Sequence, residues 1–230
     1  LTFGMMLAAY KAVMAPLGTR PVDDLAMSRM PKHLAAGLAF GATVFALIVG
    51  IAATIGVYQI SGTGSFDHFF RALIGTGLLV GFLEELLFRG ILFRWIEQMA
   101  ESWPALAVTS ILFGFAHAGN PGATWISSSA IAIEAGLMLG GAYMLSRNLW
   151  FVIGIHAGWN FTQGFIFGVP VSGSSPNGLL VAELSGPTLL SGGDFGLEAS
   201  VITLSVGLCV SIAFLWLAAR RNQFHSWPTK

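Results

Sequence analysis

Long apolar runs are the feature that most limits how this chain can fold. A helix that crosses a bilayer needs about 20 mainly apolar residues, because the hydrocarbon core is about 30 Å thick and every backbone polar group inside it needs an internal partner. Five runs meet this requirement, and a sixth is short. The runs are 34–60, 72–92, 105–118 (the short one), 123–145, 149–169 and 199–219. We therefore expect an all-α, polytopic bundle of six to seven membrane helices, the seventh being the tail of a further span within residues 1–19.

Composition supports this class and excludes others. Of the 230 residues, 55% are hydrophobic and only 10% are charged, whereas about a quarter of the residues of a soluble domain are charged. The 11 Lys and Arg balance 11 Asp and Glu without a basic cluster, so no nucleic-acid partner is expected. The single cysteine, Cys209, gives no disulfide framework. We expect one transmembrane domain over residues 1–230, with an N-terminus cut from a longer protein because the chain starts at Leu1.

The distribution of Lys and Arg predicts the orientation in the membrane. Assigning the loops alternately to two sides leaves only Arg71 on one of them. The other side holds Arg20, Arg29, Lys32, Arg94, Arg147, Arg220, Arg221 and Lys230. Basic loops favour the cytoplasmic side, so we expect a multi-pass protein of a bacterial inner membrane with a cytoplasmic C-terminus. Residues 170–198, which contain no Lys or Arg, then face outward.

The segment between Leu92 and Trp103 has a different pattern. Its apolar residues recur at helical spacing among charged residues. This pattern is typical of a helix that lies flat on a membrane surface. We therefore expect one interfacial helix on the cytoplasmic side in addition to the membrane helices.

Several ionisable residues lie inside the predicted spans, where a charge costs at least a few kcal/mol on insertion scales. They are Glu84, Glu85, Arg89, His117, Glu134 and His156, with Asn160 as a polar companion. Glu84 and Glu85 are adjacent on one helix, so their side chains project about 100° apart and should have different roles. Arg89 follows Glu85 by four residues, the spacing at which an ion pair forms on one helix face. We therefore predict a structural Glu85–Arg89 pair.

Glu84 is left without a partner on its own helix. It shares a face with Gly77 and Gly81, two small residues that let another helix approach closely. His156 and Asn160 are also four residues apart, so both point the same way from their helix.

The depths of these polar groups overlap. A rise of about 1.5 Å per residue puts His117, His156 and Asn160 at depths that overlap loosely with that of Glu84. Mutual satisfaction without function is a poor explanation for such a set, because each polar group is costly alone. Glu134 lies in the middle of a predicted helix and has no assigned partner, so its role stays open.

Three motifs occur in order on the predicted helices. They are Glu84-Glu85-Leu-Leu-Phe-Arg89, Phe113-Gly-Phe-Ala-His117 and His156-Ala-Gly-Trp-Asn160. In type and order they resemble the CPBP family of intramembrane proteases, also called Abi or CAAX-protease-like, which is related to the eukaryotic Ras-converting CAAX endoprotease. The resemblance covers residues 84–160. It implies an endopeptidase in an all-helical bundle, with a catalytic core over 72–169 and a site that opens toward the cytoplasm.

The resemblance also implies roles for the motif residues. Glu84 would be the general base that activates water, His117 would assist it, and His156 and Asn160 would stabilise the oxyanion. Glu85 and Arg89 would hold the helix and orient the site. This chemistry is reasonable, because a carboxylate in a low-dielectric site is a better base and the developing oxyanion needs preorganised donors. The expected substrate is a CAAX-like C-terminus or a bacterial peptide or membrane protein, and no cofactor is expected.

Other functions remain open at this stage. Glu84, His117 and His156 could supply three zinc ligands with water as the fourth, although the zinc-protease signature His-Glu-x-x-His is absent. The same buried groups could form the relay of a proton-coupled transporter. They could also fix helix packing in a non-catalytic membrane scaffold or immunity protein.

Overall fold

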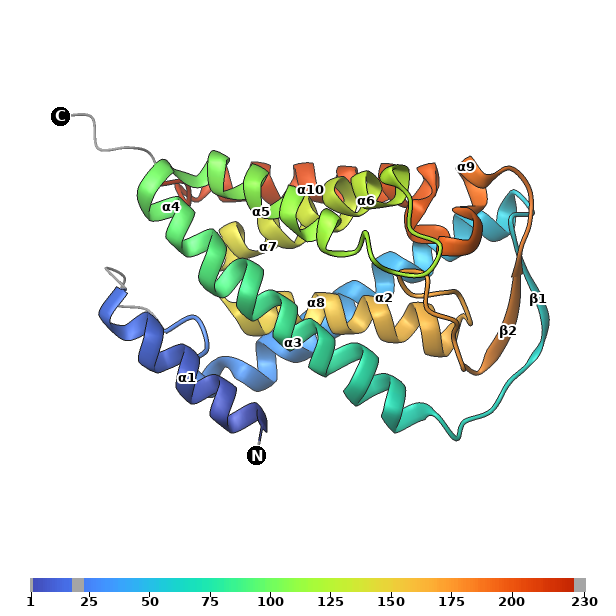
Figure 1. Ribbon diagram of the computed structural model, residues 1–230, viewed down its shortest axis with the longest axis horizontal. Coiled ribbons are helices and arrows are strands. Elements are labelled where there is room, and N and C mark those ends of the chain that lie inside the picture. The colour runs from blue at the N-terminus through green and yellow to red at the C-terminus, as the bar shows by residue number, and fades with distance from the viewer. Residues whose placement is uncertain (1, 18–22, 226–230) are drawn as a thin grey trace.

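The protein is a bundle of helices with a small sheet at one end (Figure 1). The computed structural model describes residues 2–17 and 23–225, so Arg20 and Lys230 of the charge count lie outside the described residues. The first elements are α1 (Thr2–Leu17), η1 (Met27–Arg29), α2 (Met30–Thr54) and β1 (Tyr58–Thr63). The middle of the chain forms α5 (Ser102–Ala116), α6 (Trp125–Ile131), η4 (Ala132–Gly136), α7 (Leu137–Ser146), α8 (Leu149–Phe161) and η5 (Thr162–Ile166). The last elements are β2 (Leu180–Leu184), α9 (Thr188–Ser191), η6 (Gly193–Phe195), η7 (Leu197–Ala199) and α10 (Val201–Arg220).

Among the described residues, three helical segments are long and apolar enough to cross a membrane. They are Met27–Thr54, Trp125–Ser146 and Val201–Arg220, and α5 is apolar but shorter. The protein is therefore an integral membrane protein built from helices, but the expected number of six to seven spans is not confirmed. Two further helical segments, 71–100 and 149–166, are long. They carry most of the polar motif residues, which lower their apolar character.

Residues 71–100 form one continuous helix in four parts. These are η2 (Arg71–Leu79) and η3 (Leu86–Phe93), which are π-helical, and α3 (Val80–Glu85) and α4 (Arg94–Ala100), which are α-helical. The segment that was expected to form a separate interfacial helix is α4, which continues this long helix. Its charged side chains are paired inside the protein: Arg94 donates to the Tyr10 hydroxyl over 3.2 Å, and Glu97 accepts two hydrogen bonds from Arg147 at 2.8 and 2.9 Å.

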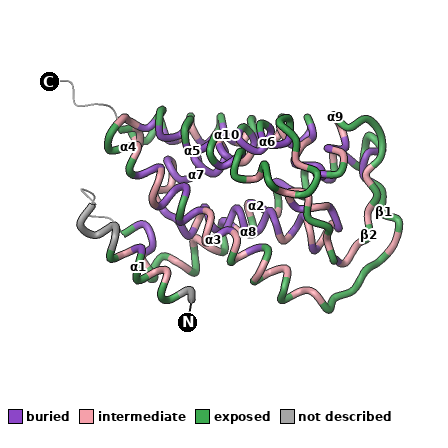
Figure 2. Tube along the Cα trace, viewed as in Figure 1, coloured by how far each residue is buried: buried purple, intermediate pink, exposed green. Residues whose placement is uncertain are grey.

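Helix α8 is the centre of the bundle and is almost entirely buried (Figure 2). It packs along α2 on one side and along η2 and α3 on another. Glycines permit both contacts: a Cβ on Gly41 of α2 would lie 2.1 Å from the Ile155 carbonyl oxygen, and one on Gly158 would lie 2.3 Å from that of Leu38. Gly77 and Gly81 face α8, since a Cβ on either would lie 3.3 Å from the backbone of Ala157. The predicted close approach at these two glycines is confirmed.

The fold is not purely helical. Strands β1 and β2 pair antiparallel, with Tyr58 opposite Leu184, at the end of the bundle away from α4 (Figure 1). The Tyr58 hydroxyl donates to the Phe167 carbonyl over 2.9 Å and so ties this sheet to the end of η5. The apolar-run analysis missed both strands because they lie in or next to the loops between spans.

Candidate active site

A cavity of about 620 Å³ lies where the three motifs meet. Its wall includes Glu84 of α3, His117 at the end of α5, and both His156 and Asn160 of α8. A volume of roughly 300–1,000 Å³ is usual for a ligand site. The structure therefore brings together the four residues that the sequence singled out as catalytic candidates.

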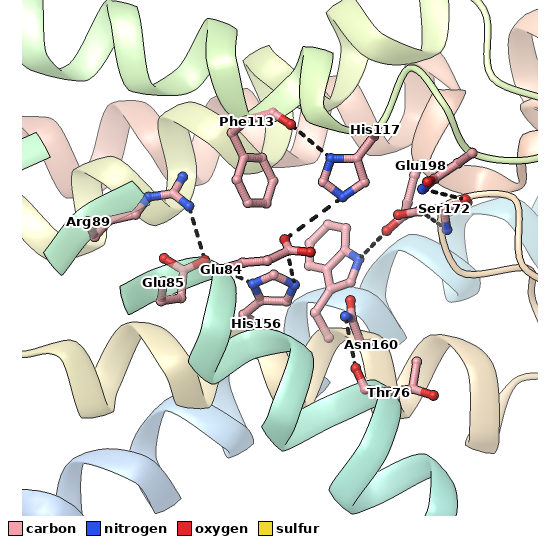
Figure 3. A network of polar contacts seen from close by, with 12 residues as sticks. Thr76, Glu84, Glu85, Arg89, Phe113, His117, His156, Asn160, Ser172 and Glu198 are labelled. Carbon is pink, nitrogen blue, oxygen red and sulfur yellow. Dashed lines mark hydrogen bonds and ion pairs between the residues drawn. The ribbon is translucent and has the colours of Figure 1, made fainter. Parts of the chain in front are cut away.

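The Glu84 carboxylate lies between the two histidines (Figure 3). Its Oε2 is 3.9 Å from Nε2 of His117 and 4.0 Å from Nε2 of His156. These separations are too long for direct hydrogen bonds, but they match groups bridged by one water molecule. The Glu84 side chain is 29% exposed, which gives a small reactant access to the carboxylate.

His117 is fixed by the end of its own helix. Its Nδ1 is 2.8 Å from the Phe113 carbonyl oxygen, and since a carbonyl oxygen only accepts, Nδ1 carries the proton. In the neutral ring Nε2 is then an acceptor, and it faces Glu84 Oε2, which is also an acceptor. Two such groups attract each other only through a shared proton or a water, which is the arrangement that water activation requires.

His156 is held from the other side by the predicted ion pair. Its Nδ1 lies 2.9 Å from Glu85 Oε1, and Arg89 Nη1 lies 3.0 Å from the same oxygen. Glu85 and Arg89 are both completely buried, so the predicted Glu85–Arg89 pair is confirmed. Arg89 also donates through Nη2 to the Gly136 carbonyl over 3.0 Å and lies over the Phe113 ring. The pair therefore links four parts of the site: the long helix, α5, η4 and α8.

Asn160 lies one turn from His156 and lines the same cavity, as its spacing predicts. Its Nδ2 donates to the Thr76 carbonyl over 3.2 Å (Figure 3). An amide nitrogen carries two protons, so this bond leaves one N–H for an incoming oxygen.

The cavity also includes residues that the motif analysis did not select. Glu198 is buried and accepts from Trp159 Nε1 at 3.3 Å and from Ser172 at its backbone nitrogen (2.6 Å) and hydroxyl (3.1 Å). Glu134, which the sequence left without a partner, is part of the wall as well. Glu198 was missed because it follows a loop far from the motifs. The sequence feature that could have pointed to Glu198 was the acidic character of residues 170–198.

The geometry bears on the zinc alternative. Glu84, His117 and His156 point toward one region, but among the described residues no three His, Cys, Asp or Glu side chains form a group that could hold a metal ion. The set lacks the pair of closely spaced ligands that usually starts a zinc site. The zinc hypothesis thus has no preformed ligand set in this part of the chain, and a chelator tests it directly.

The loops that line the cavity lie at the end of the bundle that carries Arg71. Asn120 follows α5 there, and Ser172 follows η5. Arg147 and Arg220 lie at the opposite end, where α7 and α10 finish (Figure 1). If the cavity opens at this end of the bundle, the expected cytoplasmic opening and the expected cytoplasmic C-terminus require opposite orientations of the protein in the membrane.

The cavity reaches the side of the bundle as well. Leu87 and Ala116 belong to its wall and are exposed. Leu87 lies on the long helix and Ala116 lies on α5. These two helices are close together near α4 and separate toward the opposite end of the bundle (Figure 1).

Comparison with known proteins gives a match over part of the chain. A family model described as type II CAAX prenyl endopeptidase Rce1-like matches residues 66–162, a range that includes all three motifs. No curated protein matches, and neither does any solved structure.

Proposed function

Because residues 66–162 match the family model described as type II CAAX prenyl endopeptidase Rce1-like, we propose that the protein is an intramembrane endopeptidase that hydrolyses peptide bonds with a water activated by Glu84. The observation that carries this proposal is the position of Glu84 Oε2, which lies within 4.0 Å of Nε2 of both His117 and His156. The residues provide both a base and electrophilic donors in one cavity, and no metal is needed for these roles.

The proposed reaction begins with a water between Glu84 and His117. Glu84 accepts a proton from the water while the oxygen of the water forms a bond to the scissile carbonyl carbon. The carbonyl oxygen becomes an oxyanion, which accepts from His156 Nε2–H and from the free N–H of Asn160 Nδ2. Glu84 then gives its proton to the leaving amine as the carbon–nitrogen bond breaks.

The Glu85–Arg89 pair has a positioning role in this scheme. His156 donates through Nδ1 to Glu85, so it can donate through Nε2 as well only when the ring is an imidazolium. The adjacent Glu85 carboxylate stabilises that charge, and Arg89 holds the carboxylate in place.

We further propose that the site opens on the face opposite the C-terminus. The basic residues where α7 and α10 end, Arg147, Arg220 and Arg221, favour a cytoplasmic location for that end of the bundle. The loops that line the cavity then lie on the outer face. Under this orientation the cytoplasmic opening implied by the family resemblance does not apply to this chain.

The substrate is proposed to be a peptide or a segment of a membrane protein. The opening beside Leu87 and Ala116 suits a segment that enters from the bilayer. The description of the matching family makes prenylated CAAX peptides the first class to test.

Cleavage of quenched fluorescent peptides by detergent-purified protein tests the proposal. The panel contains CAAX-type and other peptides, and it is run on the parent, on Glu84→Gln and on Glu183→Gln, a matched change at an exposed glutamate of β2. We expect Glu84→Gln to be slower by about 10²–10⁴-fold, the usual contribution of a general base, and Glu183→Gln to equal the parent. Equal cleavage by Glu84→Gln would refute the assignment of the base.

The same assay with a zinc chelator separates the two mechanisms. Activity that survives the chelator and is lost in Glu84→Gln supports the glutamate mechanism. Activity that is lost both in Glu84→Gln and in the parent with the chelator supports the zinc alternative, with Glu84, His117 and His156 as ligands.

A further inference from the structure

Glu134 is a buried acid in the cavity wall that the proposed reaction does not use. It is 1% exposed, and neither carboxyl oxygen has a hydrogen-bond partner among the described residues. A buried carboxyl group without a partner costs several kcal/mol. A side chain with this cost and this position is a candidate for binding something that enters the cavity.

The backbone around Glu134 is built to keep it there. Residues Ala132–Gly136 form a π-helical turn inside the Trp125–Ser146 helix, a distortion that is frequent at functional sites. Arg89 donates to the carbonyl of Gly136, two residues along the chain. On the other side, a Cβ on Gly207 of α10 would lie 2.8 Å from the Cβ of Glu134. Contacts on both sides thus hold this turn against the site.

The charged groups that face the cavity are mostly acidic. Its wall has three carboxyl groups, from Glu84, Glu134 and Glu198. Glu84 faces the two histidines and Glu198 already accepts from Trp159 and Ser172, so Glu134 is the carboxyl group of the wall that has neither an ion pair nor a hydrogen bond among the described residues. Arg71 is the one arginine among the described residues of the wall, and it is exposed at the start of the long helix.

From these positions we propose that Glu134 binds the side chain of a lysine or arginine of the substrate next to the scissile bond. An ammonium or guanidinium group would give the carboxylate an ion pair and hydrogen bonds, which together offset the burial of both charges. A neutral side chain would leave the carboxyl group unpaired. This inference rests on the proposed function for the identity of the ligand as a substrate, but the binding itself does not require hydrolysis.

Binding to a non-cleaving protein tests the inference. Fluorescent peptides are made in pairs that carry lysine or its neutral analogue norleucine at each position around one candidate scissile bond. Their anisotropy is measured with detergent-purified Glu84→Gln and with Glu84→Gln/Glu134→Gln. We expect one lysine peptide to bind Glu84→Gln about tenfold or more tightly than its norleucine partner, and the double variant to bind the two about equally.

Further measurements keep the outcome interpretable. Glu134→Leu, which removes the unpaired carboxyl group with a side chain of similar size, replaces Glu134→Gln if the latter is not monodisperse. Equal binding of every lysine and norleucine pair to Glu84→Gln, or a lysine preference that persists without Glu134, would overturn the inference. The parent's cleavage of the same peptides tests the proposed function separately, so binding selectivity without cleavage would refute the endopeptidase and leave the cation site standing.

Discussion

Glu85 Oε1 contacts two positively polarised groups at once, His156 Nδ1 at 2.9 Å and Arg89 Nη1 at 3.0 Å. All three side chains are buried. The carboxylate therefore balances the arginine and orients the histidine, and the loss of one member should affect both stability and catalysis.

Replacing Arg89 with methionine should strongly destabilise the protein. The change leaves the Glu85 carboxylate buried without its main counter-charge and removes the hydrogen bond to the Gly136 carbonyl. Loss of one partner of a buried pair costs about 3–5 kcal/mol, which thermal unfolding in detergent measures. The double variant Glu85→Gln/Arg89→Met should recover part of the loss, because it removes both charges. A single variant as stable as the parent would contradict this role.

His117→Ala should reduce turnover more than substrate binding. The ring faces Glu84 but is held by the Phe113 carbonyl of its own helix, so its removal leaves the fold intact. We expect kcat to fall by about 10²–10⁴-fold with little change in KM, as for the loss of an acid–base group. Steady-state kinetics on a cleaved peptide measure both constants. A rise in KM at constant kcat would instead assign His117 to substrate binding.

The sequence predicts the local geometry of the site well, because the spacing of residues on one helix fixes their common face. The Glu85–Arg89 pair and the shared face of His156 and Asn160 follow from a separation of four residues. The contact between Glu85 and His156 joins two helices 71 residues apart. No local pattern predicts such a contact. The sequence analysis gave His156 only a depth that overlaps with that of Glu84, and the structure places its Nε2 4.0 Å from Glu84 Oε2.

The misplaced parts of the fold have a common cause. Hydropathy reports whether a segment is apolar, but not whether its charges are paired inside the protein. Arg94 and Glu97 are buried and hydrogen-bonded to other parts of the chain, and the segment that looked amphipathic continues the long helix. Glu198 likewise joins the cavity through Trp159 and Ser172, contacts that depend on how the loop folds back over α8.

Gly41→Ala should destabilise the bundle, whereas Gly50→Ala in the same helix should not. A Cβ at residue 41 would lie 2.1 Å from the Ile155 carbonyl oxygen, but a Cβ at residue 50 would meet nothing within 4 Å. Overpacking of this kind costs about 1–3 kcal/mol, and alanine in an open helical position gains up to about 1 kcal/mol over glycine. Thermal unfolding of the pair gives the comparison. Equal stability of the two variants would mean that α2 does not pack on α8 this closely.

Cysteine labelling in intact cells tests the orientation. In a Cys209→Ala background, Ser174→Cys places a thiol on an exposed loop residue of the cavity wall, and Asn222→Cys places one just beyond α10 at the opposite end. With the basic end in the cytoplasm, a membrane-impermeant maleimide should label Ser174→Cys in intact cells and Asn222→Cys only after permeabilisation. The reverse pattern would put the cavity on the cytoplasmic face and would mean that the charge distribution misassigns the orientation. Because labelling needs no activity, the result is independent of whether any peptide is cleaved.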